Sequence, residues 1–239
     1  MPDELEHFGL IRRPNPERPL QGMTVLVVED SRFASEAIRL LCLRSGARIR
    51  RADTLAAAHR HLGVYRPSIV IVDLGLPDGD GVELIGELAQ MQPERPVVFA
   101  MSGDEGGKAA AMKAGADGFF AKPIESLYAF QQALLARLPE DAARFGPRPV
   151  AADMIEPDPV SLKDDLAHVA EVIDTGPDGR QVDYIAQFLH GVAKSAHDSD
   201  LKAAAEKLAV ARSKGARTSR DLAHVAGLIQ ARLAASNAI

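Results

Sequence analysis

The sequence has a single cysteine, no long apolar run and no strong excess of charge of one sign. Cys42 cannot form a disulfide bond within the chain, and a reducing compartment is expected. Apolar runs such as residues 25–28 and 69–72 contain four residues, far below the roughly 18 needed to span a bilayer. The acidic start of the chain lacks the features of a secretory signal. These absences predict a cytoplasmic protein without a membrane segment.

The charge balance is close to neutral, with 33 acidic and 28 basic residues among the 239. No general attraction to nucleic acid or to an anionic membrane follows from this balance, so partners must be inferred from local features. The length suits one α/β domain together with a smaller companion.

From residue 24 to about residue 138, short β-branched apolar runs alternate with helix-period stretches. This alternation is typical of a parallel sheet whose strands are connected by helices. We expect strands at residues 24–28, 48–52, 69–73, 96–101 and 118–121. Five such units in about 115 residues predict a flavodoxin-like five-stranded parallel sheet with helices on both faces.

Proline clusters divide the chain into four parts. Residues 1–21 contain four prolines and predict an extended N-terminal arm. Residues 22–138 form the predicted α/β domain. A proline-rich linker is expected at residues 139–160. Residues 161–239 show four amphipathic helical stripes and predict an all-helical module, typical of a small bundle.

The expected strands of the α/β domain end in residues that carry chemistry. Glu29 and Asp30 follow the first strand, Asp73 ends the third, Ser102 follows the fourth and Lys122 follows the fifth. In open parallel sheets the functional crevice lies outside the carboxyl ends of the strands. Each of these residues alone is weak evidence, but together they predict a site at one edge of the sheet.

Three carboxylates at one edge repel one another. Two carboxylates about 4 Å apart repel by about 4 kcal/mol at an effective dielectric constant of about 20. A hard divalent cation relieves this repulsion, and a set of oxygen ligands with one open side suits Mg²⁺. Such a site would allow Asp73 to act as a nucleophile toward a phosphoryl group, with Lys122 and Ser102 contacting its oxygens.

The sequence resembles the receiver domains of two-component response regulators, chemotaxis-regulator-like domains that stand at the N-terminus of such proteins. The resemblance covers about half of the chain and rests on four motifs. They are Val-Leu-Val-Val-Glu29-Asp30-Ser, Ile-Val-Ile-Val-Asp73-Leu-Gly-Leu-Pro-Asp-Gly-Asp-Gly, Met101-Ser102-Gly and Ala-Gly-Ala-Asp-Gly-Phe119-Phe-Ala-Lys122-Pro123.

The resemblance implies that Asp73 is the phosphoacceptor and that its partner is a histidine kinase or a histidine phosphotransfer protein. It implies that Glu29, Asp30, the Asp73 carboxylate and the backbone carbonyl of Gly75 bind Mg²⁺. The resemblance also implies a switch in which a hydroxyl group moves toward the phosphate and an aromatic ring turns inward behind it.

In this sequence Ser102 and Phe119 occupy the two switch positions. Serine lacks the methyl group of the commoner threonine, and phenylalanine has no phenolic oxygen, so an altered readout is expected. Gly75 offers no side chain to block a hydrolytic water, and Asp104 brings an acid near the same place. The lifetime of the phosphoryl group therefore stays open.

The helical module has no catalytic motif, so no enzymatic output is expected. Between residues 160 and 239 ten basic residues are balanced by ten acidic ones, which favours dimerisation or docking of another signalling protein over DNA binding. DNA binding is the alternative. Residues 207–220 contain five basic side chains and no acidic one, and the apolar residues at 222–233 have a spacing that resembles a helix-turn-helix. A histidine phosphotransfer bundle does not fit, because the pattern of that family places a lysine three residues after the histidine, whereas Lys194 stands four residues after His190.

Overall fold

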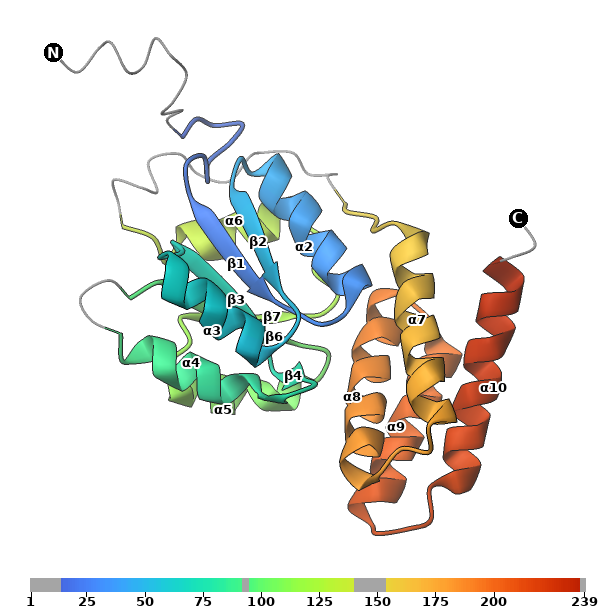
Figure 1. The fold of residues 1–239 in the computed structure, drawn as a ribbon. Coiled ribbons are helices and arrows are strands. Elements are labelled where there is room, and N and C mark those ends of the chain that lie inside the picture. Colours follow the sequence, from blue (N-terminus) through green and yellow to red (C-terminus); the bar gives the residue numbers. More distant parts are fainter. Residues whose placement is uncertain (1–13, 92–94, 140–153, 237–239) are drawn as a thin grey trace, which may run out of the picture.

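The first domain is built on a parallel sheet, as the computed structural model shows for the described residues 14–91, 95–139 and 154–236 (Figure 1). The five strands of this sheet are β1 (Thr24–Val28), β2 (Arg48–Ala52), β3 (Ile69–Asp73), β6 (Val97–Ser102) and β7 (Gly118–Ala121). Their order across the sheet is β2-β1-β3-β6-β7, and every neighbouring pair is parallel. The predicted flavodoxin-like fold is confirmed, with one strand boundary shifted: β6 begins at Val97 and includes Ser102.

Helices cover both faces of this sheet. They are α2 (Arg32–Arg44), α3 (Leu55–Val64), α4 (Gly81–Ala89), α5 (Lys108–Ala114), preceded by the 3-10 turn η1 (Glu105–Gly107), and α6 (Leu127–Leu135). A short hairpin of β4 (Gly75–Leu76) and β5 (Gly79–Asp80) follows β3. The helices α2 and α6 pack on one face, and α3, α4 and α5 pack on the other.

The central strand β3 shows why these apolar runs form a sheet. All five of its residues are buried, so both of its faces need apolar side chains. Ile69 and Ile71 pack toward α2 and α6, whereas Val70 and Val72 pack toward the opposite helices. Because the neighbouring strands run parallel to β3, their carboxyl ends meet beside Asp73.

The C-terminal third of the chain is a four-helix bundle with its own core, as the amphipathic stripes predicted. The bundle, which we call the helical module, consists of α7 (Pro159–Asp174), α8 (Gly179–Ser195), α9 (Ser199–Ser213) and α10 (Ser219–Ser236). Acidic side chains cap α7, α8 and α9 at their N-termini, where they accept hydrogen bonds from backbone N–H groups. Residues 222–233, whose spacing resembles a helix-turn-helix, lie within the continuous helix α10, so no turn falls between them.

Some predictions fall outside the described residues. Residues 1–13 of the predicted arm and residues 140–153 of the predicted linker lie there, and the domain boundaries stay predictions. The described part of the linker contacts the α/β domain: Ile155 is buried among residues of α2 and α6, and its N–H donates to the Glu125 carbonyl. Among the described helices, none is both long enough and apolar enough to cross a bilayer.

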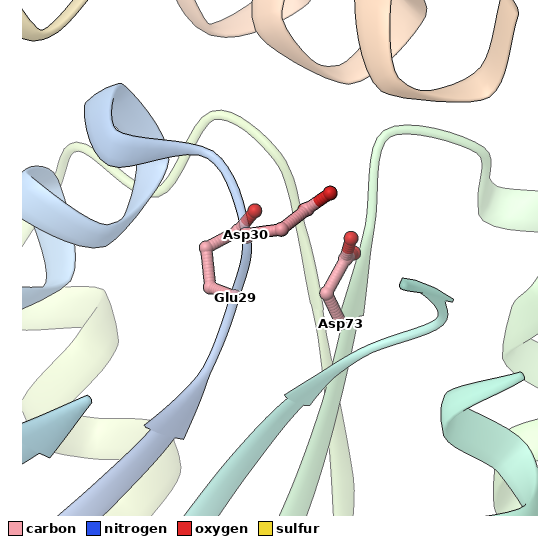
Figure 2. Close-up of side chains that lie close together, drawn as sticks. All are labelled: Glu29, Asp30 and Asp73. Carbon is pink, nitrogen blue, oxygen red and sulfur yellow. The ribbon is translucent and has the colours of Figure 1, made fainter. Parts of the chain in front are cut away.

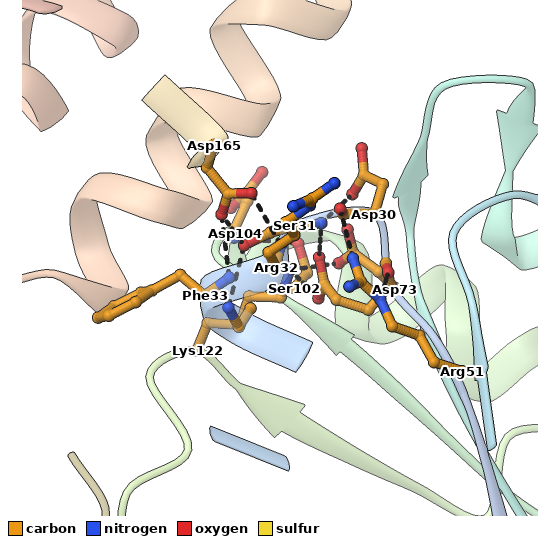
Figure 3. Close-up of polar contacts among 12 residues, drawn as sticks. Asp30, Ser31, Arg32, Phe33, Arg51, Asp73, Ser102, Asp104, Lys122 and Asp165 are labelled. Atoms are coloured by element: carbon orange, nitrogen blue, oxygen red, sulfur yellow. Dashed lines mark hydrogen bonds and ion pairs between the residues drawn. The ribbon is translucent and has the colours of Figure 1, made fainter. Parts of the chain in front are cut away.

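The helical module packs against the carboxyl edge of the sheet (Figure 1). Asp165 of α7 accepts hydrogen bonds from the Ser31 hydroxyl at 2.7 Å and from the backbone N–H groups of Arg32 and Phe33 at 2.8 and 3.1 Å (Figure 3). A carboxylate of the module thus satisfies N–H groups in the first turn of α2, which have no partner within that helix. Burial raises the pKa of Asp165, and the three hydrogen bonds oppose this shift.

We expect Asp165→Ala to lower the free energy of unfolding by about 2 kcal/mol, because it leaves buried donors without an acceptor. Chemical denaturation measures this loss, and hydrogen exchange at the start of α2 should rise. Asp164→Ala is the matched control, since Asp164 pairs with Arg32 in an exposed ion pair whose loss costs less than about 1 kcal/mol. Equal losses in the two variants would contradict the role assigned to Asp165.

Candidate functional site

Three carboxylates from two neighbouring strand ends meet at the carboxyl edge of the sheet (Figure 2). Glu29 and Asp30 follow β1, and Asp73 is the last residue of β3. Each offers an oxygen within 4.8 Å of the others. Glu29 and Asp73 are buried and Asp30 is half-buried, so water screens their mutual repulsion only weakly.

Lys122 places one positive charge among these carboxylates. It directly follows β7, and its Nζ lies 2.6 Å from Glu29 Oε2 and 3.1 Å from Asp73 Oδ1. Its side chain is only 7% exposed, so its charge acts at close range and low dielectric. One lysine faces three acids, and the cluster keeps an excess of negative charge when all of them are ionised.

Burial and the neighbouring charges shift the protonation of the three carboxyl groups. Burial raises the pKa of Glu29 to about 7 and that of Asp73 to about 7, and the charge of Lys122 opposes both shifts. Burial also raises the pKa of Asp30 to about 6, against a hydrogen bond from Tyr184. Burial opposes the charge on Lys122, but Asp73 and Glu29 raise the pKa of its ammonium above the ordinary value.

The donor set fits a hard divalent cation. Three carboxylates whose oxygens lie within 4.8 Å of one another supply only oxygen ligands, which is the set that Mg²⁺ prefers. The charge of the cation would neutralise the negative charge that remains after Lys122 has paired with the carboxylates. Glu29, Asp30 and Asp73 are the residues that would hold it.

The remaining residues expected at the site fall into two places. Ser102 and Gly75 line the same cavity as the carboxylates. The Ser102 hydroxyl accepts a hydrogen bond from the Asp104 N–H at 3.1 Å. Phe119 is half-buried and packs with the apolar residues of the face covered by α3, α4 and α5, so it lies apart from the cluster.

Residues of α8 also reach the site, and the sequence analysis missed them. The Tyr184 hydroxyl donates to Asp30 Oδ2 at 2.7 Å, and Lys194 Nζ donates to the Gly103 carbonyl at 2.9 Å. The cavity is lined on this side by Gln187, His190 and Gly191. These residues lie on one face of a helix, but this spacing indicates a functional site only weakly, because an ordinary bundle helix shows the same pattern.

Comparison with known proteins agrees with this fold. The model of the response regulator receiver domain matches residues 25–133. Residues 25–133 are therefore identified as a response regulator receiver domain. The match agrees with the resemblance that the strand-end motifs carry.

Two characterised proteins are similar to this chain in sequence. The KDP operon transcriptional regulatory protein KdpE of Escherichia coli is 34% identical over 126 residues, which are 53% of this chain and 56% of KdpE. The virulence transcriptional regulatory protein PhoP of Salmonella typhimurium is 36% identical over 119 residues, covering 48% of this chain and 53% of PhoP. The matched regions span only about half the length of these relatives.

Solved structures of receiver domains are also similar to this chain. The receiver domain (CheY-like) from Methylobacillus flagellatus has 26% identity and a TM-score of 0.43, covering 48% of this chain and 97% of that one. The receiver domain of the sensor histidine kinase PA1611 from Pseudomonas aeruginosa, solved with a magnesium ion in its active-site cleft, has 23% identity and a TM-score of 0.44. It covers 48% of this chain and 96% of that one.

We expect Mg²⁺ binding to strengthen as pH rises from 6 to 8. The ligands must lose their protons to bind a cation, and burial holds the pKa of Asp73 and Glu29 at about 7. The apparent dissociation constant should therefore fall by about tenfold for each of these two carboxyls over this range, or about a hundredfold in all, and binding near pH 6.5 should release protons. Calorimetry in buffers of different ionisation enthalpy measures both effects. Affinity that stays constant over this range would contradict the assignment of these carboxylates as ligands.

Proposed function

We propose that this chain is a phosphorylation-activated response regulator that accepts a phosphoryl group on Asp73 with Mg²⁺. The observation that carries the proposal is the meeting of Glu29, Asp30, Asp73 and Lys122 at one edge of a receiver fold. The phosphoryl donor is a histidine kinase or a histidine phosphotransfer protein. The likeness to receiver domains supports this choice of donor.

Asp73 is the nucleophile in this proposal. Its carboxylate attacks the phosphorus, and the phosphoryl group leaves the donor to form an acyl phosphate. Lys122 already lies 3.1 Å from Asp73 Oδ1 and pairs with a phosphoryl oxygen. A bound Mg²⁺ supplies positive charge that shields the incoming phosphoryl group from Glu29 and Asp30. The Ser102 hydroxyl, which lines the same cavity, donates to another phosphoryl oxygen.

The proposed output is a change in how the helical module binds another protein or a second copy of the chain. The module contacts the phosphorylation site directly, through Tyr184 at Asp30 and Lys194 at Gly103. A phosphoryl group and a cation at the site change the charge that these side chains meet, so the docking of the module depends on phosphorylation. Ser102 and Phe119 are the proposed switch residues.

We expect wild-type protein exposed to acetyl phosphate and Mg²⁺ to gain the mass of one acid-stable phosphoryl group, whereas Asp73→Asn gains none. Amide oxygen is a far weaker nucleophile than carboxylate oxygen, and intact-mass spectrometry detects the difference. The matched control is Asp53→Asn, because Asp53 is exposed and lies outside the cluster. An equal mass gain in Asp73→Asn and wild type would place the acceptor elsewhere.

A second candidate function is DNA binding, and two observations favour it. KdpE and PhoP are named transcriptional regulatory proteins. Lys214, Arg217 and Arg220 are exposed where α9 turns into α10, which gathers positive charge at one end of the module.

A mobility-shift assay on genomic fragments, with and without acetyl phosphate, tests the second candidate. We expect no shift at physiological salt in either state, because the module as a whole is neutral. A shift that Arg217→Ala and Arg220→Ala together abolish would establish DNA binding and displace protein docking as the output.

A further inference from the structure

One face of α8 covers the phosphorylation site. Tyr184 binds Asp30 near one end of the helix, and Lys194 binds the Gly103 carbonyl near the other. Between them, Gln187 lies over Gly75: a Cβ added to that glycine would come within 2.3 Å of the Gln187 amide nitrogen. The helix is thus held over the carboxylates along several turns.

His190 belongs to this face of α8. It lines a cavity of about 790 Å³ together with Asp73, Ser102 and Lys122. Its Cδ2 lies 3.2 Å from the position that a Cβ on Gly103 would take, so the imidazole stands beside the loop that follows β6. Within the described part of the chain, His190 is the histidine that lines this cavity.

The absence of a side chain at Gly103 lets α8 and His190 come this close. A Cβ on Gly103 would lie 3.0 Å from the Cα of Gly191, a backbone atom that cannot move away without shifting α8. Gly191 in turn faces Lys122, whose Nζ lies 3.9 Å from the position of a Cβ on Gly191. This is an ordinary van der Waals distance, so α8 passes close to the lysine at this residue.

The other side of the His190 ring faces α9. Its Nδ1 lies 3.6 Å from Glu206 Oε1, and its side chain is 21% exposed. A carboxylate beside Nδ1 favours the tautomer with the proton on that nitrogen. Nε2 then keeps its lone pair and is the nucleophilic nitrogen.

We propose that His190 is a second phosphorylation site, which exchanges a phosphoryl group with Asp73 within the same chain. The inference rests on the proposed function, because the phosphoryl group enters through Asp73. Nε2 attacks the phosphorus of the acyl phosphate, the P–O bond to Asp73 breaks, and the carboxylate is restored. The P–N bond that forms leaves the imidazole positively charged, and the Glu206 carboxylate balances this charge. The reverse step returns the group to Asp73.

A purely structural part in docking α8 is the other explanation of these contacts. Among the described residues, Tyr184 and Lys194 make the hydrogen bonds between α8 and the α/β domain, whereas the polar contact of the His190 ring is with Glu206 of the module. The docking of α8 therefore does not explain why a histidine lies at residue 190.

The test uses the full chain as wild type, Asp73→Asn, His190→Gln and His224→Gln, each incubated with acetyl phosphate and Mg²⁺. Alkali removes acyl phosphate from aspartate and spares phosphohistidine, whereas acid does the reverse. Peptide mass spectrometry after alkaline treatment locates any remaining phosphoryl group. His224→Gln is the matched control, because His224 is exposed on α10 and far from the cavity lining.

We expect wild type and His224→Gln to carry alkali-stable phosphate on the peptide that contains His190. His190→Gln should lose this signal by about tenfold or more while its Asp73 is still phosphorylated, and Asp73→Asn should carry neither form. Glu206→Gln should lower the ratio of the alkali-stable to the acid-stable form, a change that a docking role of Glu206 would not produce.

Three results would overturn the inference. The first is acyl phosphate on Asp73 of wild type without alkali-stable phosphate on His190, which leaves the proposed function intact. The second is labelling of His190 in Asp73→Asn at the wild-type level. The third is labelling of His190 on the Asp73→Asn chain once it is mixed with His190→Gln, which places the transfer between chains. Absence of phosphate at both sites in wild type would instead overturn the proposed function.

Discussion

Repulsion among three carboxylates at the edge of the sheet, opposed by one lysine, is the constraint on which the structure of the site depends. At about 4 Å and an effective dielectric constant of about 20, each pair of charges contributes about 4 kcal/mol. The parallel sheet forces the acids together, because β1 and β3 are neighbours and end at the same edge. Lys122, brought there by β7, relieves only part of the repulsion, and burial, with a smaller contribution from the neighbouring carboxylates, raises the pKa of Glu29 and that of Asp73 to about 7.

The sheet and the cluster could be predicted from the sequence because burial leaves a clear signature there. A strand covered on both faces must be apolar at every position, as residues 69–72 are, and the first polar residue marks its end. The boundary of β6 was misplaced by one residue for an equally local reason. Ser102 pairs with Ala121 of β7, so the ladder continues into a polar residue that the apolar pattern excludes.

The contacts of the helical module with the site were beyond what the sequence could predict. Asp165 looks like any charged residue on a helix, and only the position of α7 beside α2 turns it into a cap for another element. His190 was set aside because Lys194 stands one residue from the spacing of a known pattern. Spacing along a chain measures likeness to that pattern, whereas the cavity shared with Asp73 is a property of the fold.

The hydrogen bond from Tyr184 to Asp30 couples the docking of the helical module to the binding of a cation. The phenol donates to Oδ2 of a carboxylate that is also a ligand candidate, so docking of the module and binding of a cation both involve Asp30. Thermodynamic reciprocity then requires that the factor by which the docked bundle changes cation affinity equals the factor by which the cation changes the affinity of docking. The concentration of the cation and the position of a four-helix bundle are thereby linked through one side chain.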